Sequence, residues 1–296
     1  FRCCKRETFL PLTNCGGVNT DHRPRTIVTW NVQGLFYFMN KEKGMNIVNM
    51  LLRMTQADII CLQEVFENSL KESIIYKLKD THPYYLLGNT EKRYLFGEDS
   101  GLLVLSKYPI EFVKELILDE YYFPDRLANK SMLFFKVGDL NLMNTHLQSN
   151  NMFDNSDIST KQLQYMKDEC PFDRCIFVGD LNNMQAYQHL GLRKNNIIRT
   201  WGKDEILDYI LPWNYDDLLR VRNTSVPNID ISNVSDHYPL WCQFYDTLGH
   251  YGILNVGATT NSNLDVDVVG DMPTACNSDY MIGVGRTDNQ DQTAGG

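Results

Sequence analysis

The chain has 296 residues, of which 43% are hydrophobic and 22% charged, and its formal net charge is −9. This composition is ordinary for a globular protein and excludes collagen, long coiled coils and wholesale disorder. No apolar run approaches the roughly 18 residues of a membrane-spanning helix. The net negative charge also disfavours a protein that binds nucleic acid through an overall positive charge.

The pattern of apolar residues predicts an irregular lead-in over residues 1–25, followed by one α/β domain over residues 26–246. Apolar residues at helical spacing predict helices, and short β-branched or apolar runs predict strands. The expected helices are 41–54, 69–78 and 159–169; the expected strands are 26–30, 57–62, 102–105, 110–118, 131–137, 140–145, 175–178, 206–211 and 238–244. Gly138-Asp139 predicts a hairpin turn. Hairpins mixed with helical crossovers favour a four-layer α/β/β/α sandwich of two mixed sheets with helices outside.

The composition changes at about Thr247. Residues 247–296 lack Lys and Glu, are dense in Gly, Asn, Asp and Thr, and carry five of the nine net negative charges. We expect a flexible or loop-rich tail there. Residues 252–256 and 280–284 are strand-like pieces within it.

Four apolar runs end in polar residues: Val28–Asn31, Ile59–Glu64, Ile176–Asn182 and Val234–His237. Strand ends deliver side chains to loops, where functional sites form. Asn, Asp and Glu oxygens suit Mg²⁺ or Mn²⁺ rather than zinc, and a His beside carboxylates suits acid–base chemistry near neutral pH. Each run alone would ordinarily be a solvated strand end or a turn. Their joint occurrence indicates metal-assisted hydrolysis of a phosphate ester.

These and two further segments carry a family resemblance. They are Thr29-Trp-Asn-Val-Gln-Gly34, Leu62-Gln-Glu-Val65, Asn144-Thr-His146, Gly179-Asp-Leu-Asn182, Leu207-Asp-Tyr-Ile210 and Ser235-Asp-His-Tyr-Pro239. In this order they resemble the motifs of the endonuclease/exonuclease/phosphatase superfamily, the deoxyribonuclease-I-like fold. The resemblance spans residues 26–245 and implies the four-layer sandwich and divalent-metal hydrolysis of phosphodiesters or phosphomonoesters.

The resemblance also implies roles for individual residues. Glu64 would be the main Mg²⁺ ligand, with Asn31 close by and Asp236 either a ligand or a neighbour of one. His237 would take a proton from the attacking water, and Asp208 would hold its imidazole. The remaining members are assigned to the water and the phosphate: Asp180 and Asn182 would orient both, and His146 would donate to a phosphate oxygen.

Within the superfamily the chain is most similar to the neutral sphingomyelinases. The segment 98–110, the Leu62–Phe66 and Asn144–Gln148 pieces, and the stretch Asp125–Lys130 resemble that branch. Asp99 and Lys130 thereby become candidate substrate-binding residues, although an exposed turn is an equal reading for Asp99. The abasic-site endonucleases fit less well, since Gln33 and Ile206 stand where that branch has Asp and Arg.

These features favour a Mg²⁺-dependent phosphodiesterase that removes a phospholipid head group. The alternatives are a nuclease of the same fold, a soluble inositol-phosphate phosphatase, and a catalytically silent binding or assembly domain. If the substrate is a phospholipid, a membrane surface would be contacted by Tyr121, Tyr122 and Phe123. The alternative is that these aromatic side chains pack on the body of the protein. The compartment stays open, with a secreted or membrane-peripheral location favoured; Cys170 and Cys175 would bridge if the protein were secreted.

The tail has a resemblance of its own. Gly252–Thr260 and Pro273–Gly285 resemble an internal piece of a subtilisin-like serine protease, between its oxyanion-hole Asn and its catalytic Ser. The protease's His and Ser motifs are missing, so no protease activity is implied. A genuine fusion, an assembly artefact and a chance likeness all remain open.

Overall fold

The computed structural model describes residues 13–14, 23–35, 39–91, 98–118, 128–149, 158–192, 198–202, 205–215, 219–226, 229–246, 255–258 and 281–284. The chain divides into two compact units. The first comprises residues 1–216 and 221–245, and the second comprises residues 217–220 and 246–296.

One mixed sheet holds seven strands in the order β1-β4-β5-β3-β2-β12-β11. In this sheet β2 and β3 are parallel, and β12 pairs with β2 antiparallel. Their bounds are β1 Thr13–Asn14, β2 Thr26–Asn31, β3 Ile59–Gln63, β4 Tyr84–Leu87, β5 Leu103–Ser106, β11 Leu219–Ser225 and β12 Leu240–Asp246.

The other mixed sheet holds five strands in the order β10-β9-β8-β7-β6. Here β8 and β9 are parallel and the remaining pairs are antiparallel. The two-residue turn at Gly138-Asp139 joins β7 to β8, and Gly138 has a positive φ of 57°, as the first central residue of such a turn requires. The bounds are β6 Ile110–Ile117, β7 Ser131–Val137, β8 Leu140–His146, β9 Cys175–Asp180 and β10 Asp208–Trp213.

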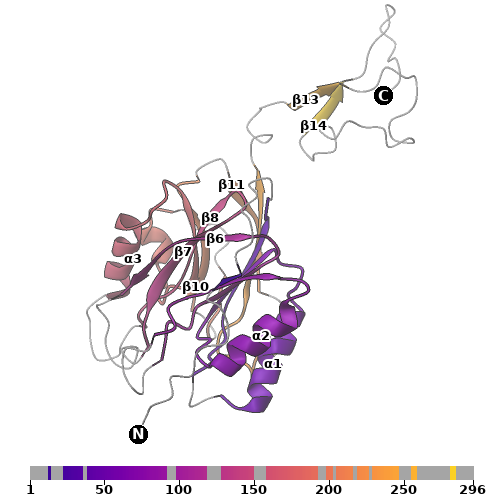
Figure 1. Ribbon diagram of the computed structural model, residues 1–296. Helices are drawn as coiled ribbons and strands as arrows, with labels where there is room; N and C mark the ends of the chain where they lie inside the picture. Colours follow the sequence, from indigo (N-terminus) through magenta and orange to yellow (C-terminus); the bar gives the residue numbers. More distant parts are fainter. Residues whose placement is uncertain are drawn as a thin grey trace, which may run out of the picture. The chain divides into compact units, whose positions relative to one another are not determined.

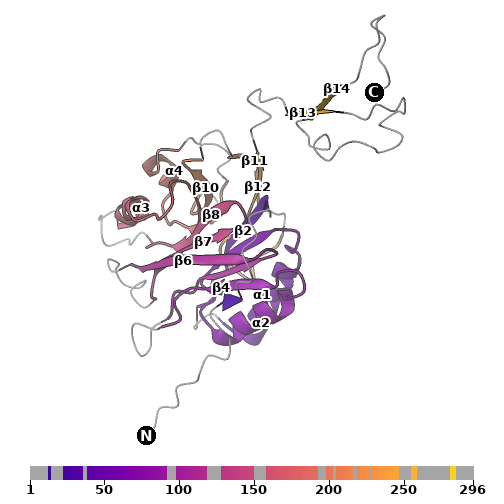
Figure 2. The ribbon, with the colours of Figure 1, turned by 45° about the horizontal axis from the view of Figure 1, so that its top comes forward.

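Helices cover the outer face of each sheet (Figure 1). α1 (Lys41–Leu52) and α2 (Asn68–Leu78) pack their apolar stripes on the first sheet, in a core that includes Trp30 and Leu62. α3 (Ile158–Asp168) and the short α4 (Ala186–His189) lie together on the other side, over β7 to β10 (Figure 2). The order of layers is therefore helix, sheet, sheet, helix, as the sequence predicts.

Alternation along the strands explains how the layers are held. In β2 and β3, Val28, Trp30, Ile60 and Leu62 face the helices, so the residues between them face the second sheet. β2 lies against β9 and β10, and β3 against β8 and β9. The inner faces are buried, which makes these central strands almost continuously apolar.

The strand directions bring six chain segments to one edge of the sandwich. The parallel strands β2 and β3 end there, and so do β8 and β9, whose last residues are paired as His146 with Asp180. β10 runs antiparallel to β9 and begins there, with Asp208 opposite Asp180. β12 likewise begins beside the end of β2, with Leu240 opposite Thr29. Every polar strand end singled out from the sequence lies at this edge.

Most predicted elements are confirmed with boundaries shifted by one to three residues. The structure adds β4, β11 and α4, which the sequence analysis did not predict, and also β1, which lies within the stretch 1–25 that was expected to be irregular. In the second unit, β13 (Asn255–Ala258) and β14 (Met281–Val284) form a parallel pair, close to two strand-like pieces expected in the tail. Among the helices in the described part of the chain, none is long and apolar enough to cross a membrane.

Gly179 allows a test of how closely β9 packs beside β8. Its φ is +130°, and a Cβ atom would lie 2.0 Å from the carbonyl oxygen of Thr145 on the neighbouring strand. We expect Gly179→Ala to lower the free energy of unfolding by about 2–4 kcal/mol, because backbone must move to admit the methyl group. Gly191→Ala is the matched control, since Gly191 also has positive φ but nothing lies within 4 Å of its Cβ position. Urea unfolding that gives equal losses for both variants would contradict this interpretation.

Candidate active site

The centre of the site is a group of buried side chains supplied by both sheets. Asn31 ends β2, Glu64 follows β3, His146 ends β8 and Asp180 ends β9. The Asn31 side-chain nitrogen donates to Glu64 Oε1 and to Asp180 Oδ2, both at 3.0 Å. One amide thus fixes a carboxylate of each sheet, which places the two acids side by side across the sandwich.

Two imidazoles flank the Asp180 carboxylate. His146 Nε2 lies 3.6 Å from Asp180 Oδ2 and 3.8 Å from Glu64 Oε1. His237 Nε2 lies 3.7 Å from the same Asp180 oxygen. The two histidines therefore point their Nε2 atoms into one space, with Asp180 between them.

His237 is oriented by a buried Asp–His pair. Its Nδ1 lies 2.8 Å from Asp208 Oδ2, and both side chains are almost fully buried. The backbone of His237 is held as well, because its N–H donates to Ser235 Oγ and its carbonyl accepts from Trp30 Nε1. The Nδ1 contact leaves Nε2 as the nitrogen that faces the site.

The charges in this group perturb one another strongly. Burial disfavours the imidazolium, but Asp208 and Asp180 outweigh it and raise the pKa of His237 to about 10. Burial, together with the Asp208 charge, raises the pKa of Asp180 to about 7 despite the opposing effect of His237. Perturbation of this size at clustered buried acids and bases is typical of functional sites.

Glu64 has the features of a cation ligand. Its Oε2 atom is buried and has no hydrogen-bond partner among the described residues, and burial raises its pKa. A buried carboxylate oxygen without a hydrogen-bond partner lowers the stability of the fold unless a cation or a donor binds it. Ligand atoms of Asp180, Asp208 and His237 also lie within 4.8 Å of one another. Because His237 Nδ1 is engaged by Asp208, we favour Glu64 with Asp180 as the oxygen ligands of a hard divalent cation such as Mg²⁺ or Mn²⁺.

Glu64 is held in a strained backbone conformation by its neighbours. Its φ is +57°, in the left-handed region that non-glycine residues rarely adopt. Gly34 donates its N–H to the Glu64 carbonyl, and a Cβ at Gly34 would lie 2.3 Å from that oxygen. On the other side Gly101 leaves room for the Glu64 Cα and accepts the next N–H, from Val65. Two glycines therefore make the turn possible.

The structure places Asp99 behind this turn and outside the central group. Its carboxylate is buried, forms an ion pair with Lys71 and accepts the Gly101 N–H at 2.9 Å. Lys71 Nζ also donates to the carbonyl of Phe66, two residues after Glu64. Asp99 is buried, so it does not lie in an exposed turn, and it braces the Glu64 turn. Its candidate role in substrate binding stays a prediction.

Lys130 and Asn182 do lie at the site. The buried Lys130 ammonium donates to the carbonyl of Leu147 at 2.7 Å, and its charge lowers the pKa values of Glu64 and Asp180. Asn182 has a positive φ of 47°, and its side chain donates to the same carbonyl at 3.0 Å. Its N–H donates to Asp180 Oδ1, which fixes that carboxylate from a second direction.

Asp236 stands at the exposed rim, where it meets a residue that the sequence reasoning missed. Trp201 Nε1 donates to Asp236 Oδ2 at 3.1 Å, and the indole lies 6.4 Å from the His237 ring between centroids. A second missed residue is Lys43 on α1, whose ammonium donates to the backbone carbonyl and to the side-chain oxygen of Gln33. The charges of Asp236 and Glu64 act on this ammonium and oppose the lowering of its pKa by burial. Neither belongs to a polar strand end, so neither gave a signal.

Below the site a buried network of hydrogen bonds joins the two sheets. Gln63 Nε2 donates to Asn144 Oδ1 at 2.8 Å and to Thr29 Oγ1 at 3.0 Å, and Asn144 Nδ2 donates to the Leu62 carbonyl. All three side chains are fully buried. Gln63 and Asn144 stand inside motifs noted in the sequence, and their burial shows that they support the site from within.

Other sequence predictions fall elsewhere. Tyr121, Tyr122 and Phe123 lie outside the described residues. Cys170 and Cys175 are free thiols in the structure, one half-buried and one buried.

The Lys71–Asp99 ion pair gives a stability prediction. We expect Lys71→Met to lower the free energy of unfolding by about 3–5 kcal/mol, because it leaves a buried carboxylate unpaired. Lys136→Met, which breaks the exposed pair with Glu111, should cost at most about 1 kcal/mol. Chemical denaturation compares them, and adding Asp99→Asn to Lys71→Met should recover part of the loss. A Lys71 variant as stable as the Lys136 variant would contradict the stabilising role of the Lys71–Asp99 ion pair.

Glu64 gives a metal-linked prediction. We expect saturating Mg²⁺ to raise the melting temperature by about 5–10 °C at pH 8 and by less at pH 5.5. The sign follows from its raised pKa: without metal, ionising Glu64 costs stability as pH rises, and protons compete with the cation as pH falls. Glu64→Gln should abolish the Mg²⁺ effect, and Glu72→Gln on the exposed face of α2 should keep it. An unchanged shift in Glu64→Gln would exclude this ligand.

Comparison with known proteins supports the architecture. Sphingomyelinase C of Bacillus cereus is 26% identical over 151 residues, a segment that covers 42% of this chain and 45% of that protein. The chain thus matches less than half the length of this relative. Two crystal structures share the fold at 18% identity and a TM-score of 0.58, each covering 75% of this chain and 99% of the other. They are sphingomyelinase C from Streptomyces griseocarneus and a mutant beta toxin from Staphylococcus aureus with bound magnesium ions.

The family assignment rests on a longer match. The profile of the Endonuclease/Exonuclease/phosphatase family aligns with residues 28–237, which is more than half of the chain. That range begins in β2 and ends at His237, so it contains the six residues that meet at the site: Asn31, Glu64, His146, Asp180, Asp208 and His237. By this match and by its fold, the chain belongs to the Endonuclease/Exonuclease/phosphatase family.

Proposed function

We propose that the protein is a divalent-metal-dependent phosphodiesterase that hydrolyses the head-group ester of a phospholipid. The observation that carries the proposal is the His237–Asp208 pair, whose Nε2 faces Asp180 beside the open oxygen of Glu64. A base, an oriented carboxylate and an incomplete ligand set in one buried group match what hydrolysis of a phosphate ester requires.

The residues divide the reaction among them. Glu64, supported by Asp180 and Asn31, would hold a Mg²⁺ or Mn²⁺ ion, which neutralises charge on the phosphate and the leaving oxygen. A cation held by Glu64 and Asp180 would oppose the carboxylate charges that raise the pKa of His237, so that its Nε2 would accept a proton from water while the water oxygen bonds to phosphorus. The bond from phosphorus to the leaving oxygen would break, and the alkoxide that leaves would take up a proton from solvent. Asp208 stabilises the imidazolium that forms. His146, on the opposite side of Asp180, donates to a phosphate oxygen as charge develops there.

A phospholipid substrate is favoured over nucleic acid by two considerations. The relatives found by sequence are sphingomyelinases C, as is one of the structures that share the fold, and the body of the chain, residues 1–246, is itself net negative. A silent binding domain is disfavoured because burying Glu64, Asp180 and Asp208 together without a catalytic or metal-binding use would only cost stability. We assign the activity to residues 26–246 and give residues 247–296 no part in it. Contact of Tyr121–Phe123 with a membrane stays a sequence-based prediction.

The test is release of phosphocholine from sphingomyelin in mixed micelles, run beside hydrolysis of bis(4-nitrophenyl) phosphate and nicking of plasmid DNA. We expect Mg²⁺-dependent turnover of lipid and of the small diester. His237→Ala should lower both rates by about 10²–10⁴-fold, because the water loses its base. His189→Ala, a histidine on the exposed face of α4, should leave them unchanged.

Each other outcome decides against a part of the proposal. Plasmid nicking without lipid turnover would keep the site and reassign the substrate to nucleic acid. No turnover of any diester by folded protein would refute the proposed enzymatic function. Full activity in His237→Ala would show that His237 is not the base.

A further inference from the structure

A polar layer crosses the interior of the sandwich one step inward from the candidate site. Thr29 on β2, Gln63 on β3 and Asn144 on β8 face the space between the sheets, because side chains alternate along a strand. All three have an exposed fraction of 0%. The next inward-facing pair on β8 and β9, Leu142 and Ile176, is apolar and equally buried. The polar layer therefore separates the apolar core from the charged group at the edge.

Two members of this layer stand beside a site residue on their own chain segment. Gln63 ends β3 and directly precedes Glu64, and Asn144 stands two residues before His146 at the end of β8. Residues two apart on a strand point to the same face, so Asn144 and His146 lie side by side on the inner face. A displacement of Gln63 or Asn144 would therefore also move a site residue of the same sheet.

Asn144 holds the end of β3 by two hydrogen bonds from the other sheet. Its Oδ1 accepts from Gln63 Nε2 at 2.8 Å, and its Nδ2 donates to the Leu62 carbonyl at 3.2 Å. Within the first sheet, Gln63 Nε2 also donates to Thr29 Oγ1 at 3.0 Å. One bond between the sheets reaches a side chain and the other reaches the backbone, both just before Glu64. The position of Glu64 relative to the second sheet is fixed at this point.

Burial by itself does not call for amides in this layer. Two buried polar partners can be replaced by apolar groups of similar shape with little loss of stability, whereas removing one partner leaves the other without a hydrogen bond. The neighbouring inner face is already apolar, as at Leu142 and Ile176. Hydrogen bonds differ from apolar contacts in being directional and of nearly fixed length. What the amides add here is a defined spacing between the two sheets.

We propose that Gln63 and Asn144 are positioning residues for the candidate site. By fixing the spacing of Glu64 from Asp180 across the sandwich, the pair sets the affinity for a divalent cation and the rate of hydrolysis. The inference rests on the proposed function for the reaction, whereas its consequence for cation binding can be measured without turnover. The two amides bond to each other, to Thr29 and to the backbone of β3, so they act through the residues that follow them.

The spacing matters because a single amide bridges it at the site. Asn31 Nδ2 lies 3.0 Å from Glu64 Oε1 and 3.0 Å from Asp180 Oδ2, so a separation of the sheets would lengthen one of these contacts. His146 Nε2, at 3.8 Å from Glu64 Oε1, would move as well. A misplacement of about 1 Å can cost about 10²-fold in rate, and losing the support behind a metal ligand costs about 10–100-fold in metal affinity.

The first test is isothermal titration of the full chain with Mg²⁺ alone. Gln63→Leu leaves Asn144 without its donor, and the double variant Gln63→Leu with Asn144→Leu makes the layer apolar. We expect both to weaken Mg²⁺ binding by about 10–100-fold. In urea the double variant should unfold at a higher concentration than Gln63→Leu, since neither amide of the pair is left behind. Recovery of Mg²⁺ affinity together with stability in the double variant would overturn the proposal.

Exchanging the two amides gives a rescue that a positioning role predicts. Gln63→Asn shortens one side chain by a methylene group, and Asn144→Gln lengthens the other by the same amount. Each substitution alone should weaken Mg²⁺ binding about tenfold. Together they should bring the affinity back to within about threefold of the wild type, because the hydrogen bond between the amides can form again. An exchanged pair that binds as weakly as either single variant would overturn the proposal.

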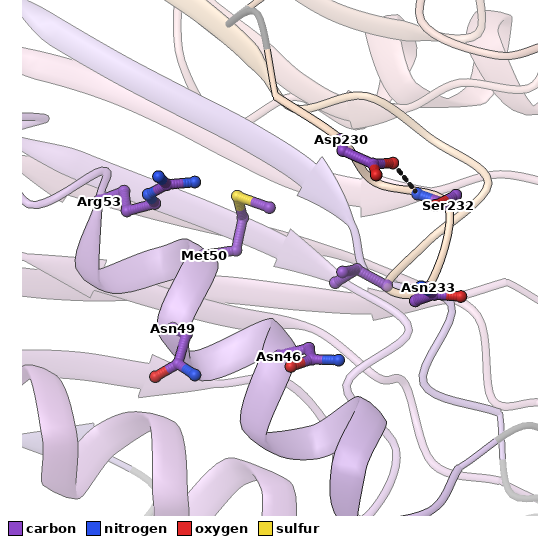
Figure 3. A pocket seen from close by; sticks show the side chains of 8 residues that line it. Asn46, Asn49, Met50, Arg53, Asp230, Ser232 and Asn233 are labelled. Carbon is purple, nitrogen blue, oxygen red and sulfur yellow. Dashed lines mark hydrogen bonds between the residues drawn. The ribbon is translucent and has the colours of Figure 1, made fainter.

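Two controls separate positioning from stability and from the loss of an amide as such. His82→Leu removes a buried hydrogen bond near the other end of β3, where His82 Nε2 lies 3.0 Å from the Ala57 carbonyl. Asn49→Leu removes an exposed amide that lines a surface cavity beside α1 (Figure 3). Both should keep the Mg²⁺ affinity within about twofold of the wild type. A loss of affinity in His82→Leu equal to that in Gln63→Leu would show that the affinity follows stability, against the proposal.

Turnover of bis(4-nitrophenyl) phosphate at saturating Mg²⁺ gives the second readout. We expect Gln63→Leu to lower kcat by about 10–100-fold and to change KM by less than about threefold, because misplaced groups fail in the transition state. A raised KM with unchanged kcat would contradict the positioning role, and so would a wild-type protein that binds no Mg²⁺. Mg²⁺ binding that is lost and rescued as described, in a protein that hydrolyses no diester, would support the positioning role and refute the proposed function separately.

Discussion

The burial of Glu64, Asp180 and Asp208 at one edge of the sandwich is the constraint on which the site depends. Carboxylates that close together, largely withdrawn from water, repel one another and lose hydration. Several polar neighbours act against this cost: Asn31 donates to two of the acids, His237 pairs with the third, and Lys130 adds positive charge nearby. Glu64 Oε2 and Asp208 Oδ1 are buried without a hydrogen-bond partner among the described residues, and a cation at Glu64 would become favourable there.

The architecture is suited to delivering such a group because a parallel strand pair of each sheet ends at the site. Parallel strands finish at the same edge, so β2 with β3, and β8 with β9, each present two chain ends together. The antiparallel neighbours β10 and β12 start where those strands finish. The buried Gln63–Asn144 contact then sets the two sheets in register below the site. The geometry of the candidate site is thus a property of the two packed sheets.

The strained turn at Glu64 illustrates how local cost is tolerated at a functional position. A glutamate at φ +57° persists only when its surroundings over-determine it. Here the two glycines, the Val65 hydrogen bond and the buried Lys71–Asp99 pair do so together. The family resemblance singled out Asp99, but it could not predict the ion pair with Lys71, which lies 28 residues away on α2.

The sequence by itself determined the layered fold, the strands that form the core and the polar ends that carry the chemistry. Apolar periodicity is local, and burial follows from it directly, so Trp30, Leu62 and Phe177 were placed without tertiary information. The six motifs also contained the central residues, because each of these residues lies at or beside the end of its own strand. Only the tertiary structure decided which of these groups touch, that Asp99 braces a turn, and that Trp201 and Lys43 lie beside the site. Such relations arise from contacts between distant segments, whose distances depend on sheet packing and register, and no single stretch of sequence encodes them.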